Sequence, residues 1–148
     1  MKRAYPLITQ SIAGYGFTHG VELDYTEFTA AALTETISLI SVPAGTVVRS
    51  VMVRCDIGFG DGAIDVTDSN VTVGDGGDVD RFVASSGVFT TDVGSQYVDG
   101  GSGTLPHQYS SADTIDLVIT NTGVGGNVAN FTTGRLTVLL DLVMPVGL

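Results

Sequence analysis

The sequence is poor in the residues from which most catalytic and metal sites are built. Its 148 residues include no tryptophan, one cysteine and two histidines. The single cysteine, Cys55, excludes an internal disulfide. His19 and His107 occur without an HExxH or CxxC motif, so they do not indicate a zinc site. We therefore expect neither a disulfide framework nor a zinc centre.

Long apolar runs are also missing. No segment approaches the ~20 apolar residues that a membrane-spanning helix requires. The N-terminal residues MKRAYPLITQ begin with basic side chains but lack the continuous apolar stretch of a signal peptide. The sequence thus predicts a protein made in the cytosol, with no membrane partner and no secretion by the classical route.

Positive charge is scarce. Six lysine and arginine residues face sixteen acidic ones, which gives a formal net charge of −10. The basic residues are dispersed along the chain, whereas a protein that grips phosphate backbones needs them clustered on one face. This distribution excludes nucleic acid as a predicted partner.

Motifs for catalysis are absent as well. The chain has no GxSxG nucleophile elbow and no P-loop, and its glycine-rich loops do not lead into a helix that would hold phosphate. Cys55 falls on the inward face of a predicted strand, which favours a small buried apolar residue over a reactive thiol. We predict that the protein is not an enzyme.

What the chain does contain is typical of a β-protein with many turns. Hydrophobic residues make up 43% of it and glycine contributes 20 residues, beside abundant threonine, serine and valine. About eight short strand candidates are separated by turn residues, and no repeat of 20–50 residues occurs. The predicted fold is all-β: an antiparallel β-sandwich, jelly-roll-like, with an extended N-terminal arm.

Alternation of apolar and polar residues locates the main strands. Residues 46–57 alternate, with one face formed by Val51, Val53, Cys55 and Ile57. Residues 135–144 form the strongest candidate, with one face formed by Leu136, Val138, Leu140, Leu142 and Met144. Residues 27–33 are the only helix-like segment, of at most a turn or two, because helices this short are marginal alone. Residues 92–108 are expected to form a long Gly/Ser-rich loop, in which residues 99–103 face solvent or a partner.

The first twenty residues differ from the rest, because Pro6 and Gly14-Tyr15-Gly16 interrupt regular structure while large apolar side chains recur. We divide the chain into an arm at 1–20 and one β-sandwich domain at 21–148. The arm either adds a strand to its own sheet or docks on a neighbouring subunit. The interface candidates are Tyr5, Leu7, Ile8, Tyr15 and Phe17 in the arm and Leu139 and Val143 on the second face of the last strand.

Two aspartate-rich loops are candidates for calcium, because closely spaced aspartates with turn glycines can supply oxygen ligands. The candidate ligands are Asp61, Asp65, Asp75, Asp78 and Asp80. Neither loop matches the EF-hand register or the calcium-binding β-helix nonapeptides. Aspartate and glycine are also preferred in tight turns without any metal. We expect structural turns and no cofactor, and keep calcium as the alternative.

Several segments, taken in order, resemble small virion structural proteins of tailed bacteriophages, of the capsid decoration or cement type. They are Phe28–Leu39, Val42–Val48, Val71–Phe82, Tyr109–Ile115 and Gly134–Val138. The resemblance covers most of the chain from about residue 26 onward, and the arm lies outside it. It implies a virion component without catalytic residues.

The function that follows is a decoration protein on the outer surface of the phage head, made in the host cytoplasm. Its partners would be the major capsid protein and further copies of itself, as a homotrimer, because icosahedral shells present threefold positions. The alternative is a tail or fibre module that binds carbohydrate or another tail protein. Tyr97 and Tyr109, which flank the long loop, are the aromatic candidates for sugar contacts.

Overall fold

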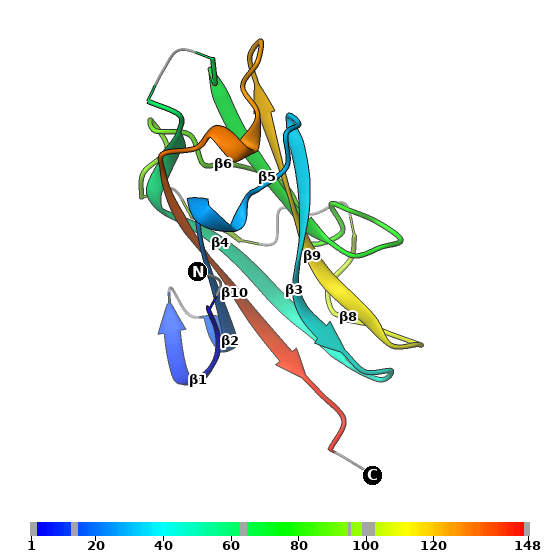
Figure 1. The fold of residues 1–148 in the computed structure, drawn as a ribbon. Helices are drawn as coiled ribbons and strands as arrows, with labels where there is room; N and C mark the ends of the chain where they lie inside the picture. The colour runs from blue at the N-terminus through cyan, green and yellow to red at the C-terminus, as the bar shows by residue number, and fades with distance from the viewer. Residues whose placement is uncertain (1–2, 13–14, 63–64, 95, 99–102, 147–148) are drawn as a thin grey trace.

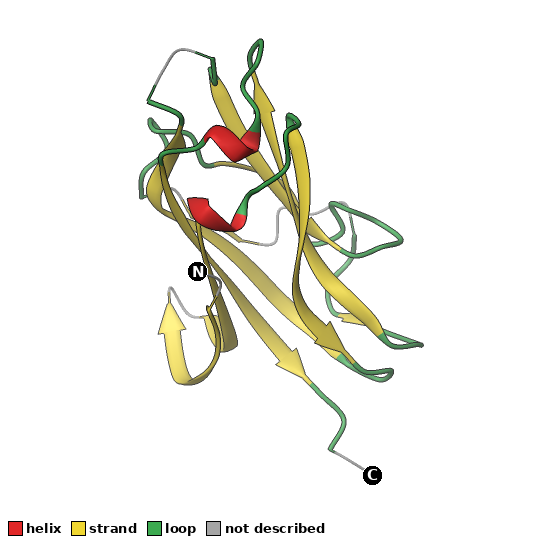
Figure 2. Ribbon diagram, viewed as in Figure 1, coloured by secondary structure: helices red, strands yellow, loops and turns green. Residues whose placement is uncertain are grey.

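The computed structural model describes residues 3–12, 15–62, 65–94, 96–98 and 103–146. Within them lie ten strands and two single-turn 3₁₀ helices (Figures 1 and 2). The strands are β1 (Arg3–Ile12), β2 (Tyr15–Asp24), β3 (Thr34–Val42), β4 (Val47–Gly60), β5 (Asp68–Gly74), β6 (Val83–Gly87), β7 (Gln96–Val98), β8 (His107–Gln108), β9 (Asp113–Thr122) and β10 (Thr133–Val143). The helical turns are η1 (Tyr25–Glu27) and η2 (Val128–Asn130).

The strands form two antiparallel sheets that face each other (Figure 1). Sheet A has the order β1-β2-β10-β4-β7, with β8 also paired to β4, and sheet B has the order β3-β9-β5-β6. The arrangement confirms the all-β sandwich predicted from the sequence. The jelly-roll connectivity stays a prediction. Among the described residues, no helix is long and apolar enough to cross a membrane.

The core fills the space between the sheets, and it follows the predicted alternation. Val51, Val53 and Cys55 of β4 are buried against inward residues of β10 and sheet B, and the inward face of β10 is formed by Leu136, Val138, Leu140 and Leu142. At one end, the rings of Phe28, Phe59 and Phe131 pack edge to face with centroids 5.2–6.0 Å apart.

Ile57 departs from the predicted face. Cys55 lies opposite Leu136 of β10, and Ile57 lies opposite the adjacent Arg135, so one extra residue of β4 is inserted between them. Such a β-bulge reverses the alternation. The side chain of Ile57 is therefore 44% exposed rather than part of the core.

The helix-like segment at 27–33 was wrongly assigned. Only Tyr25–Glu27 forms a helical turn, and the following residues run without regular structure. Their backbone carbonyls accept hydrogen bonds from another part of the chain. The carbonyls of Leu33, Ala32 and Ala30 accept from the backbone N–H groups of residues 121, 128 and 129, respectively. Tertiary hydrogen bonds thus replace those of a helix. The predicted loop at 92–108 also contains the short strands β7 and β8.

The N-terminal residues form a hairpin that extends sheet A. β1 pairs with β2, and residues 19–24 of β2 pair with β10. The expected boundary at residue 20 therefore lies within a strand. Where the backbone pairing of β2 to β10 ends, the Thr18 hydroxyl continues it by accepting from the N–H of Leu142 at 2.8 Å. The separate role of residues 1–20 as an arm stays a prediction.

Candidate functional site

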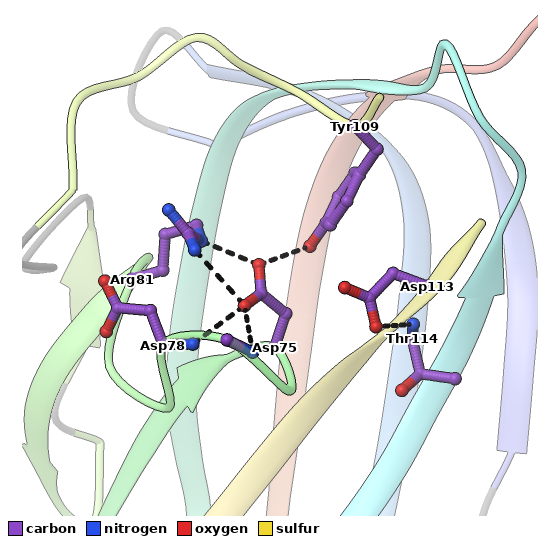
Figure 3. Close-up of polar contacts among 7 residues, drawn as sticks. Asp75, Asp78, Arg81, Tyr109, Asp113 and Thr114 are labelled. Atoms are coloured by element: carbon purple, nitrogen blue, oxygen red, sulfur yellow. Dashed lines mark hydrogen bonds and ion pairs between the residues drawn. The ribbon is translucent and has the colours of Figure 1, made fainter. Parts of the chain in front are cut away.

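The connection between β5 and β6 holds a buried carboxylate, that of Asp75, which several donors surround (Figure 3). Its Oδ1 accepts from the backbone N–H groups of Gly77 at 3.0 Å and Asp78 at 2.9 Å. Its Oδ2 accepts from Arg81 Nε at 2.6 Å and from the hydroxyl of Tyr109 at 3.1 Å. The side chain of Asp75 is 2% exposed, so a buried charge is matched by four donors.

The local sequence explains why this turn forms. Asp75 N–H donates to the Asp78 carbonyl at 2.9 Å, and Asp78 N–H donates back at 3.2 Å. A Cβ on Gly74, the last residue of β5, would collide with the carbonyl oxygen of Asp78. Glycine is required there because the two backbone segments approach so closely.

Burial and hydrogen bonding act in opposite directions on Asp75. Burial by itself raises the pKa of this carboxyl, but hydrogen bonds from Arg81, the Gly77 backbone and Tyr109 outweigh it and hold the pKa below its usual value. Burial, together with the neighbouring Asp75 charge, raises the pKa of Tyr109. Asp75 is therefore ionised and Tyr109 neutral at physiological pH, which suits a donor–acceptor pair and not a proton-transfer pair.

The Asp75 network joins three connections at one end of the sandwich. Tyr109 also exchanges backbone hydrogen bonds with the β3–β4 turn, donating to Thr46 at 2.9 Å and accepting from Gly45 at 2.7 Å. The ring of His107 packs edge to face on Tyr109 at 4.8 Å and on Phe82 at 5.8 Å. The network is thus a structural clamp on this end of the molecule.

The β4–β5 connection, which holds Asp61 and Asp65, is built differently. Asp61 is half-buried and accepts from the N–H of Val66 at 3.3 Å, and Asp65 is exposed. The backbone carbonyl of Asp65 lies against Gly123 and Gly126, where a Cβ would collide with it. Close packing of the Asp65 backbone against these glycines therefore helps to fix the end of this connection.

The five aspartates considered for calcium do not converge. Both Asp75 oxygens already accept from protein donors, and Asp78 and Asp80 are half-buried on the following turn. Among the described residues, no three His, Cys, Asp or Glu side chains are grouped as metal ligands. Binding of calcium by these loops is untested.

The histidines and the cysteine have structural surroundings. His19 Nδ1 lies 2.8 Å from the Thr18 hydroxyl, which is already engaged by the β10 backbone, and burial lowers the pKa of His19. Burial raises the pKa of Cys55 to about 11, and its thiol donates to the Val88 carbonyl at 3.7 Å. A thiol with so high a pKa is a poor nucleophile at neutral pH.

The outer surfaces of the two sheets differ in charge. The charged face of sheet A carries Glu22, Arg49, Arg54, Asp56, Arg135 and Asp141, with Thr137 buried among them. Arg54 pairs with Asp56 at 2.7 Å, and Arg49 with Asp141 at 2.9 Å. Thr137, which the sequence analysis did not single out, donates to Asp56 at 2.6 Å. A hollow of about 560 Å³ at one end of this face is lined by Glu22, Tyr25, Ile57 and Arg135 among others.

The hydroxyl face of sheet B has no basic residue in any of its four strands. Strand register sets its outward residues in rows across β3, β9 and β5: Thr34, Thr120 and Asn70, then Thr36, Val118 and Thr72, then Ser38 and Asp116. Five of these eight outward residues carry a short hydroxyl side chain. Sequence alternation alone does not reveal the rows, because they depend on register.

The structure places the interface candidates in unlike positions. Phe17 and Leu139 are 1% and 2% exposed, packed with Met52 on the outer side of sheet A, whereas Val143 is 46% exposed. Tyr5, Leu7 and Ile8 belong to β1 and Tyr15 begins β2, but their side chains are outside the described part. Contact of these seven residues with another subunit stays a prediction.

The two tyrosines considered for sugar contacts differ as well. Tyr109 is 5% exposed and its hydroxyl is bonded to Asp75, so its ring offers no platform for stacking. Tyr97 belongs to β7, and its side chain is outside the described part. Residues 99–102 of the predicted loop are likewise not described.

Comparison with known proteins finds a shared fold but no family. No protein-family model matches the chain, and no curated protein matches it. Among solved structures, a chain of the cyanophage Pam1 capsid asymmetric unit is similar, with a TM-score of 0.58 and 20% sequence identity. The likeness covers 85% of this chain and 82% of that one. At this level of identity, the comparison establishes a common fold.

Proposed function

We propose that the protein is a structural component of a phage virion, a decoration protein that binds the outer surface of the head and bridges capsid subunits. The observation that carries this proposal is the shared fold with a chain of the cyanophage Pam1 capsid asymmetric unit over 85% of the sequence. The order of sequence segments that resembles phage decoration proteins points the same way. The proposed work is mechanical, without catalysis.

The construction of the sandwich suits such a role. A decoration protein must keep its shape while the shell is under internal pressure, which favours a densely packed core and fixed connections over mobile lids. The Asp75 clamp ties three connections together at one end, and the backbone of residues 30–33 is hydrogen-bonded to residues 121–129 at the other. Both ends of the molecule are held by contacts distant in sequence.

Self-association, as a homotrimer, is the second part of the proposal. Val143 at the end of β10 and the β1–β2 hairpin beside it are the candidate contacts. Burying an exposed valine in an interface carries little desolvation penalty, because no charge must be removed from water. The edge of β1 also leaves backbone groups that another strand would pair.

Location and copy number in purified particles test the proposal directly. We expect the protein in isolated heads, in hundreds of copies, removable without loss of the tail. A few to a few dozen copies, found with tails, would contradict head decoration and favour the tail or fibre alternative. Glycan binding by the purified protein would point to that alternative as well.

A matched pair of variants tests the subunit contact. Val143→Asp places a charge at the proposed interface, and Val79→Asp places the same charge on a valine that is 56% exposed in the β5–β6 connection. We expect Val143→Asp to reduce the trimer fraction and the occupancy on capsids, while Val79→Asp leaves both unchanged. Equal behaviour of the two variants would remove Val143 from the interface.

A truncation tests the hairpin. Deleting residues 1–12 removes β1 but keeps Phe17 in its site against Met52 and Leu139. We expect a folded protein with cooperative unfolding and weakened capsid binding. Full capsid occupancy of this variant would leave β1 with a role only within its own sheet.

A further inference from the structure

Two segments at one end of the sandwich contain no charged residue, although the chain has a net charge of −10. They are residues 29–34, which lead into β3, and residues 122–130, which connect β9 to η2 and include it. Backbone hydrogen bonds join the two segments; for example, the N–H of Val128 donates to the carbonyl of Ala32 at 2.9 Å. Both lie at the same end of the molecule (Figure 1). We call these residues the uncharged end.

The uncharged end exposes apolar side chains. Val124, at the tip of the β9–η2 connection, is 96% exposed, and Leu33 is 41% exposed. Ala31 and Ala32 beside Leu33 are exposed as well. Single apolar residues are common on protein surfaces, but these share a surface without charge. Such a surface suits the centre of a protein interface, because no charged group must be removed from water there.

A buried polar side chain holds the tip in place. Asn121 is 3% exposed, and its Nδ2 donates to the Gly126 carbonyl at 2.9 Å while its Oδ1 accepts from the Ser69 hydroxyl at 2.8 Å. The N–H of Asn121 donates to the Leu33 carbonyl at 2.8 Å. Val124 therefore lies on a connection that is bonded to the rest of the fold on both sides. A preformed tip loses little conformational freedom on binding.

We propose that the uncharged end docks on the outer surface of the capsid shell, with Val124 at the centre of the contact. This inference rests on the proposed function and adds the contact surface to it. Acidic residues flank the uncharged end: Asp68 lies opposite Thr122 in the sheet, and the exposed Asp65 has its backbone against Gly123. The complementary partner surface is therefore apolar where it meets Val124 and positively charged around that point.

The position of the uncharged end favours the shell over a second copy as its partner. The proposed subunit contacts, Val143 and the β1–β2 hairpin, lie toward the opposite end of the sandwich (Figure 1). In a cyclic trimer the copies are related by rotation, so their three uncharged ends lie at the same height along the axis. Three tips can then contact the shell together, and such multivalent binding strengthens weak individual contacts.

Binding to phage heads assembled without the protein tests the docking surface. Val124→Asp places a charge at the tip, and Val146→Asp places the same charge on a valine that is 91% exposed after β10, at the other end of the molecule. We expect Val124→Asp to bind heads at least about tenfold more weakly than wild type, and Val146→Asp to bind like wild type. The trimer fraction in solution should be the same for both variants, because the tip is not a proposed subunit contact.

Two further variants sharpen the test. Val124→Leu keeps the tip apolar and should bind like wild type. Asp65→Lys reverses an exposed charge beside the uncharged end and should slow association with heads, an effect that added salt removes. An association rate equal to that of wild type at low salt would overturn the positive margin of the partner surface. Cooperative thermal unfolding shows that each variant is folded.

The outcomes separate the docking surface from the proposed function. Wild-type protein that fails to bind heads contradicts head decoration and the docking surface together. Binding that Val124→Asp leaves unchanged overturns the docking surface alone. Equal weakening by Val124→Asp and Val146→Asp also overturns it, because a general effect of added negative charge would then explain the loss.

Discussion

The two aspartate-rich connections look alike in the sequence and differ in the structure. Asp75 is buried and accepts from four donors, so its connection depends on one carboxylate. Asp61 is half-buried and accepts from the N–H of Val66 at 3.3 Å, and the backbone of its connection packs against glycines of another loop. Two connections of similar composition are therefore fixed in different ways. The burial of the carboxylate and the hydrogen-bond donors around it determine the difference.

The comparison also shows why composition alone does not identify a metal site. Aspartates beside glycines suit calcium and tight turns equally well. In the β5–β6 connection, protein donors occupy the oxygens that a cation would need. The positive charge that neutralises the Asp75 carboxylate comes from Arg81, six residues further along the chain, whose Nε lies 2.6 Å from it.

Replacing the buried carboxylate should have the largest effect. Asp75→Ala leaves the Arg81 guanidinium and the Tyr109 hydroxyl without their partner, and we expect a loss of about 3 kcal/mol in the free energy of unfolding. Urea denaturation measures this loss. A loss no greater than that of Asp61→Ala would abolish the proposed difference between the two connections.

Acid should remove the same contribution progressively. The pKa of Asp75 lies below its unfolded value, so its carboxylate stabilises the folded state above about pH 4, and this contribution is lost as the pH falls through the folded pKa. We expect the stability gap between wild type and Asp75→Asn to be constant near neutrality and to close in acid. A gap that is independent of pH would contradict the ionised role of Asp75.

Removing one donor should have a moderate effect. Tyr109→Phe keeps the buried ring but deletes the hydroxyl that donates to Asp75 at 3.1 Å. We expect a loss of about 1 kcal/mol in unfolding free energy. Tyr25→Phe, at an exposed tyrosine outside the clamp, is the control and should change stability little.

The β4–β5 connection should tolerate substitution of its aspartate better than the β5–β6 connection does. Asp61→Ala removes a carboxylate that is only half-buried and accepts from the Val66 N–H at 3.3 Å, and we expect a loss of about 0.5 kcal/mol in the free energy of unfolding. Thermal melting of this variant beside Asp75→Ala measures the contrast. A loss as large as that of Asp75→Ala would show that the Asp61 carboxylate matters as much to its connection as Asp75 does to its own.

The smallest effect should come from metal. A ligand that binds only the native state raises its melting temperature. Because the Asp75 oxygens are already occupied, we expect the same melting temperature in excess calcium and in chelator. A rise in melting temperature with calcium would support a metal site. Loss of that rise in Asp61→Ala or in Asp75→Ala would show which of the two loops binds the ion.

Much of the fold was predictable because strand alternation is a local signal. Val51, Val53 and Cys55 on β4 and the even-numbered residues of β10 are buried as predicted. Ile57 was not predictable, because the inserted residue that turns it outward is defined only by pairing with β10. Leu139 is covered by Phe17 of the hairpin, more than a hundred residues away in sequence.

The sequence by itself determined the class of the protein: all-β, acidic, rich in turns and without the motifs of catalysis, because composition and two-residue alternation are properties of neighbouring residues. Only the tertiary structure decided what each aspartate does. Burial of Asp75, its pairing with Arg81 and Tyr109, and the lesser burial of Asp61 depend on segments that folding brings together. Local sequence specifies that a turn forms, whereas the groups packed around the turn specify its energetics and its chemistry.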